Sequence, residues 1–143
     1  MNPPETIELR LRTMRTLWIG MLLSMAGYFA FTLFVGRPDG REPNPTLSLI
    51  LLGVAVAAAL ISFPLKSKLL NRAVEQQQVQ LVQQAYIVAW AVNEVGALSG
   101  LLDFFTTGDR YYYVLFIIAA IAQLLHFPNR EHVQNAAGKR PVF

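Results

Sequence analysis

The sequence predicts an all-α integral membrane protein, a four-helix bundle made of two antiparallel transmembrane hairpins. The chain of 143 residues holds four long apolar blocks that are almost free of charge. Each block has close to the 20 or so residues that a helix needs to cross the hydrocarbon core. Because lipid offers the backbone no hydrogen-bond partner, blocks this long and this uniform favour helices over alternating barrel strands. We expect one membrane domain over residues 1–143.

The first two blocks, residues 17–35 and 47–65, are the most uniformly apolar. The first follows several arginines, as the core of a signal peptide does, but it is longer than such a core. The chain then continues as GRPDGREPNP instead of a small-residue cleavage site, so the block is interpreted as an uncleaved span. The Gly- and Pro-rich link predicts a turn that makes these two helices antiparallel neighbours.

The third and fourth blocks span residues 81–102 and 111–127, and the short TTGD segment between them predicts the second hairpin. The third block is the least uniformly apolar, because it contains Asn93 and Glu94 in its interior. The link over residues 64–80 contains good helix formers and no glycine. We therefore expect helix 3 to begin well before the membrane and to extend into the cytoplasm.

The basic residues predict the orientation, because short cytoplasmic loops carry the excess of Lys and Arg. With four spans, nine basic residues fall on the side of the two termini and the middle link: Arg10, Arg12, Arg15, Lys66, Lys68, Arg72, Arg130, Lys139 and Arg140. Three fall on the other side: Arg37, Arg41 and Arg110. The sequence thus predicts a multi-pass protein of the cytoplasmic membrane with both ends in the cytoplasm.

Glu94 is the candidate functional residue, because it lies near the middle of the third block. A bare carboxylate at that depth is costly, and burial favours the neutral form. Asn93, Gln123, Ser24 and Tyr28 are candidate hydrogen-bond partners, and the sequence leaves the choice open. Glu94 with Asn93 and Gln123 could form a proton or ion site. The alternative is a protonated glutamate that ties two helices together.

Small residues predict where helices approach one another closely. They occur at a spacing of four: Gly96 and Gly100, Gly53 and Ala57, and Gly20 and Ser24. The simpler interpretation of these pairs is packing within the chain, and self-association is the alternative.

The sequence offers little for catalysis or for a cofactor. It has no cysteine, no phosphate-binding Gly loop, no nucleophile elbow and no H-E-x-x-H motif. His126 and His132 are expected near the cytoplasmic surface, and two histidines without a carboxylate cluster do not predict a metal site. Asp103, Asp109 and Arg110 are expected on a solvated outer loop. We expect no metal, no cofactor and no nucleic-acid partner, and we do not expect an enzyme.

The leading functional hypothesis is a structural, accessory or assembly protein that acts through helix–helix contacts in the bilayer. Its partners would be lipid together with other membrane subunits or further copies of itself. The alternative is a proton-linked transporter or channel that uses Glu94 in the membrane core.

Overall fold

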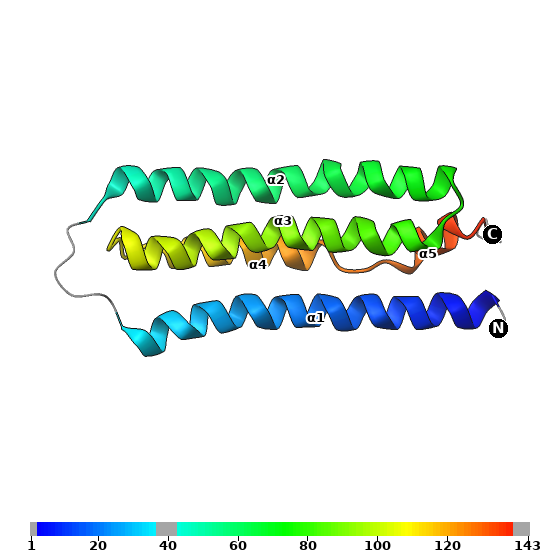
Figure 1. The fold of residues 1–143 in the computed structure, drawn as a ribbon, viewed down its shortest axis with the longest axis horizontal. Coiled ribbons are helices and arrows are strands. Elements are labelled where there is room, and N and C mark those ends of the chain that lie inside the picture. The colour runs from blue at the N-terminus through cyan, green and yellow to red at the C-terminus, as the bar shows by residue number, and fades with distance from the viewer. Residues whose placement is uncertain (1–2, 37–42, 139–143) are drawn as a thin grey trace.

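The computed structural model describes residues 3–36 and 43–138, and these residues form helices and no strand (Figure 1). The all-α prediction is therefore confirmed. The helices are α1 (Pro3–Val35), α2 (Pro45–Glu75), α3 (Val79–Thr106), α4 (Tyr113–Leu125) and α5 (Arg130–Ala136).

Three of these helices, α1, α2 and α3, are long and apolar enough to cross a membrane. The fourth predicted span is shorter than expected, because α4 has 13 residues and rises only about 20 Å. It is followed by α5 after a bend of 51°, and the two together would make a fourth span. Pro128 lies within this break, where it disfavours helical geometry in the residue before it. The chain is thus a multi-pass membrane protein with three or four spans.

The expected extension of helix 3 into the cytoplasm is wrong, because the residues after Pro64 belong to α2. This helix continues through Pro64 to Glu75, and α3 begins only at Val79. The turn is a Schellman motif. The Gln78 N–H bonds to the Ala73 carbonyl at 3.0 Å, and Gln77 has a φ of 51°. Glycine usually takes this left-handed position. Because a glutamine stands here instead, the sequence lacks the usual signal for the end of a helix.

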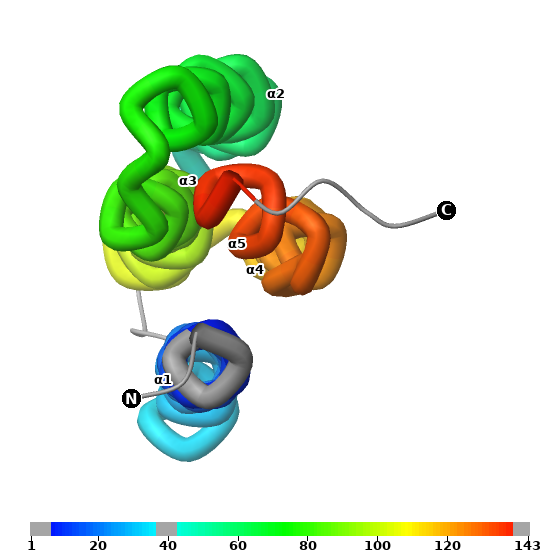
Figure 2. Tube along the Cα trace, turned by 90° about the vertical axis from the view of Figure 1, so that its right-hand side faces the viewer, coloured from blue at the N-terminus to red at the C-terminus, as the bar shows by residue number. Residues whose placement is uncertain are grey.

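The first predicted hairpin is also corrected by the structure. Helices α1 and α2 run antiparallel, but within the described residues they do not contact each other. They lie on opposite sides of α3, which contacts both of them (Figure 2). Nine residues separate α1 from α2, a length that can reach about 30 Å, so the link does not force the two helices together.

Helix α3 is the central element of the bundle. Half of its most apolar stretch is buried, compared with 22% for α2 and 11% for α1. The second hairpin is present, since α4 turns back and packs against α3. The start of α1, the α2–α3 turn and α5 all lie at one end of the molecule, which we call the α5 end (Figure 1).

A packed apolar cluster fills the α5 end. Its buried members come from α1, α2, α3 and α5, and they include Met14, Leu70, Tyr86, Trp90 and Val133. Met14, Leu70 and Val133 lie outside the predicted spans. The flanking segments of α1, α2 and α5 therefore pack with the start of the third apolar block into one core.

Candidate functional site

Glu94 lies half-buried on α3 and faces α1. Tyr28 donates a hydrogen bond of 2.9 Å to Glu94 Oε1, and Ser24 donates a weaker one of 3.3 Å to the same oxygen. Ser24 and Tyr28 are four residues apart, so they share one face of α1. The structure thus selects two of the four candidate partners, and both come from the same helix.

Asn93 and Gln123 form a separate pair between α3 and α4. The Asn93 Nδ2 group donates to Gln123 Oε1 at 3.5 Å, and both side chains are almost fully buried. Within the described residues Asn93 Oδ1 and Gln123 Nε2 have no partner. Neighbouring residues on a helix point about 100° apart, so Asn93 and Glu94 face different helices. The three predicted site residues therefore do not form one cluster.

Gln123 also joins α4 to α1 through its backbone. Its carbonyl accepts a hydrogen bond of 2.9 Å from Trp18 Nε1. The Trp18 ring meets Phe127 edge-on, with the ring centroids 5.1 Å apart. Helix α1 is thus held to the rest of the bundle by polar contacts at Glu94 and at Trp18, and by a hydrogen bond of 3.4 Å from Thr32 Oγ1 to the Tyr112 hydroxyl.

The small residues of α3 lie against other helices of the same chain. A Cβ on Gly96 would stand 3.2 Å from Ala119 and 3.7 Å from Ala55, so Gly96 lies between α4 and α2. A Cβ on Gly100 would stand 2.9 Å from the Phe116 ring. Both glycines are therefore sites of close approach within the chain.

The small residues of α1 and α2 lie differently. A Cβ on Gly20 or Gly53 would meet nothing within 4 Å, and Ala57 is exposed. Ser24 instead bonds to Glu94. Of the six predicted packing residues, Gly96, Gly100 and Ser24 thus face another helix of the chain, whereas Gly20, Gly53 and Ala57 face outward.

Asp103 was expected on a solvated loop, and this prediction is wrong. Its side chain is fully buried and accepts hydrogen bonds from Ser48 Oγ at 3.1 Å and Thr107 Oγ1 at 2.6 Å. The Asn44 N–H also bonds to the Thr107 carbonyl, so this contact ties the start of α2 to the end of α3. Asp103 follows Gly100 by three residues and so continues the buried stripe of α3, a signal that the sequence does contain.

The histidines take part in a polar cluster at the α5 end. Tyr86 and His132 are joined by a hydrogen bond of 2.6 Å between the hydroxyl and Nδ1, and the Asn129 N–H bonds to the same hydroxyl. His126 is fully buried, and its Nδ1 bonds to the Ala122 carbonyl. Among the described residues no group of three His, Cys, Asp or Glu side chains could hold a metal ion. Sequence patterns did not reveal this cluster, because its members are far apart in the chain.

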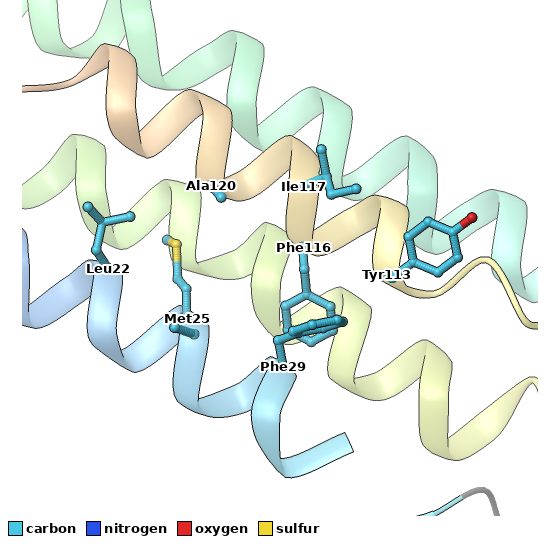
Figure 3. Close-up of a pocket in the computed structure, with 8 residues that line it drawn as sticks. Leu22, Met25, Phe29, Tyr113, Phe116, Ile117 and Ala120 are labelled. Carbon is cyan, nitrogen blue, oxygen red and sulfur yellow. The ribbon is translucent and has the colours of Figure 1, made fainter. Parts of the chain in front are cut away.

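An apolar groove of about 420 Å³ opens between α1 and α4 (Figure 3). The residues that line it recur every three or four positions on each helix: Leu22, Met25, Ala26 and Phe29 on α1, and Tyr113, Phe116, Ile117 and Ala120 on α4. Figure 3 shows Phe29 and Phe116 close together at its floor, where their centroids are 5.5 Å apart. Glu94 is not among the residues that line this groove, and none of those residues is charged.

The comparisons with known proteins found no relative. No family model, no curated protein and no solved structure matches this chain. Its function therefore has to be argued from the geometry of its own side chains.

Proposed function

We propose that this protein is a structural or accessory component of a membrane, which acts through helix–helix contacts in the bilayer. In this proposal Glu94 is a polar tie that holds α1 against α3. The observation that carries the proposal is the pair of hydrogen bonds from Tyr28 and Ser24 to one oxygen of Glu94. Two hydroxyl donors from a single helix bond to the same carboxyl oxygen and hold α1 against α3.

The arrangement of polar groups favours this role over transport. A proton or ion path needs polar side chains that follow one another across the membrane. Glu94 faces α1, whereas Asn93 and Gln123 face each other between α3 and α4. The groove between α1 and α4 is lined by apolar side chains and by the ring of Tyr113. These polar groups act between different pairs of helices, as expected for packing.

The outer faces of α1 and α2 support contacts with lipid and with other membrane subunits. Large apolar side chains such as Leu23, Leu49 and Leu60 are well exposed. Gly53 and Ala57 leave a shallow strip on the outer face of α2, where another helix could approach closely. The proposed partners are therefore other membrane proteins or further copies of this chain, in addition to the bilayer.

The two roles of Glu94 can be separated with purified protein in liposomes. We expect no proton flux above that of empty liposomes when a potassium gradient and valinomycin set the membrane potential. The Glu94→Gln variant should behave in the same way, since glutamine keeps an oxygen for Tyr28 and Ser24. A proton flux that Glu94→Gln abolishes would overturn the structural proposal and establish the transport alternative.

The accessory role is tested in native membranes. After gentle extraction, the protein should migrate as a complex much larger than its own 16.0 kDa. Gly53→Leu, placed on the outer strip of α2, should shrink that complex while the purified variant keeps its melting temperature. A protein that is monomeric in native membranes, before and after the substitution, would contradict the accessory role.

A further inference from the structure

A polar groove of about 200 Å³ lies between α2 and α5, separate from Glu94 and from the groove between α1 and α4. It is lined by Ser67, Leu70, Asn71, Val74, His132 and Asn135. Ser67 and Asn71 are four residues apart on α2, and His132 and Asn135 are three apart on α5, so each pair shares one helix face. Two rows of polar side chains therefore face one groove.

The contacts of Tyr86 fit a neutral His132 that carries its proton on Nε2. The Asn129 N–H donates to the Tyr86 hydroxyl oxygen at 3.1 Å. The hydroxyl proton is then available to His132 Nδ1, which lies 2.6 Å away. A neutral imidazole that accepts at Nδ1 carries its proton on Nε2. In that tautomer the Nε2–H group is the hydrogen-bond donor that His132 brings to the groove it lines.

The groove thus offers donors that suit an anion: the Ser67 hydroxyl, the amide groups of Asn71 and Asn135, and His132 Nε2–H. Positive charge lies close by. Lys66 Nζ stands 5.1 Å from the centroid of the Tyr86 ring, which holds His132. The exposed carboxylate of Glu131 lies next to His132 in the chain and opposes an anion, and it accepts a hydrogen bond of 3.5 Å from the Asn129 amide. A fully ionised phosphate has hydrogen-bond acceptors and no donor, so it matches this set of donors.

The depth of the groove identifies the source of the phosphate. Ser67 and Val74 lie two and nine residues past the predicted end of the second span at Leu65, which at 1.5 Å per residue is about 3 to 14 Å. The headgroup layer occupies roughly 5 to 8 Å on each side of the hydrocarbon core. The end of the groove near Ser67 and Leu70 therefore falls at the level of lipid phosphates, and Leu70 gives it an apolar wall.

We propose that the groove between α2 and α5 binds the phosphate of an anionic phospholipid headgroup. The lipid would bridge α2 and α5 and hold the short α5 against the bundle. This site is independent of Glu94, so its failure would leave the proposed accessory role untouched.

The test uses the full-length protein in detergent, with short-chain phosphatidic acid, diacylglycerol with the same acyl chains, and inorganic phosphate as probes. Native mass spectrometry should show phosphatidic acid bound and diacylglycerol absent. The double variant Ser67→Ala/Asn71→Ala should bind phosphatidic acid about tenfold more weakly, as expected for two lost hydrogen bonds. Gln80→Ala, an exposed amide on α3 outside the groove, is the matched control and should bind as the wild type does.

Both substituted side chains of the double variant are exposed, so it should keep the melting temperature of the wild type without lipid. His132→Gln, measured in the same way, provides a second variant on the opposite wall. Equal binding of phosphatidic acid and diacylglycerol would overturn the proposal, and so would equal loss in the double variant and in Gln80→Ala. Tight binding of inorganic phosphate that excludes the lipid would overturn the lipid assignment.

Discussion

Gly100 lies directly beneath the ring of Phe116, and a Cβ built on Gly100 would stand 2.9 Å from two carbons of that ring. The contact joins α3 to α4 at a point where only a hydrogen atom fits. It explains why a glycine stands in the interior of a helix, where glycine is otherwise unfavourable by about 1 kcal/mol relative to alanine.

Gly100→Ala should therefore destabilise the protein, because the ring of Phe116 must move to admit the methyl group. The expected loss is about 1–3 kcal/mol, measured as a lower melting temperature in detergent. Gly53→Ala is the matched control, since a Cβ there meets nothing within 4 Å. It should be neutral or slightly stabilising, and equal melting temperatures for both variants would contradict the close approach.

Glu94→Ala should lower stability by about 1–2 kcal/mol, because it removes the acceptor for Tyr28 and Ser24. Glu94→Gln should lose much less, since its side-chain oxygen can accept the same bonds. A double-mutant cycle with Tyr28→Phe measures the coupling directly. A coupling energy of zero would show that the 2.9 Å contact does not hold α1 to α3.

Asp103→Ala should destabilise the end of the bundle opposite α5, because it leaves the buried Ser48 hydroxyl without its acceptor. The Thr107 hydroxyl loses the carboxylate and keeps only the backbone carbonyl of residue 103. We expect a loss of about 1–3 kcal/mol, together with faster hydrogen exchange at the start of α2. Thr46→Ala, at an exposed position in the first turn of α2, serves as the control. An unchanged exchange rate at Ser48 would show that the Asp103 contact does not hold α2.

The orientation can be tested with single cysteines, because the chain contains none of its own. An impermeant thiol reagent should label Asp39→Cys and Arg110→Cys in intact cells. It should label Asn2→Cys and Asn135→Cys only after the membrane is opened. The physical reason is the excess of basic residues on the side of the termini. Labelling of either terminal cysteine in intact cells would contradict the predicted topology.

The site was only partly predictable from the sequence. The cost of a carboxylate inside an apolar block singles out Glu94 from the sequence alone. The choice among its four candidate hydrogen-bond partners required the structure. Tyr28 and Ser24 are more than sixty residues away in the chain, and only the packing of α1 on α3 brings them to Glu94. Asp103 was misplaced because it stands next to a turn, although it continues the buried stripe of α3.

By itself the sequence determined the all-α class and the long apolar helices, because both follow from hydropathy along a continuous segment. The tertiary structure decided which helices are neighbours. It placed α3 between α1 and α2 and continued α2 through Pro64 to Glu75, where a turn without glycine follows. It also directed Glu94 and Asn93 toward different helices. In a bilayer all outer faces are apolar, so hydrophobicity alone does not distinguish a lipid-facing side from a buried one. The close fit of small residues and the few polar contacts between helices make that choice.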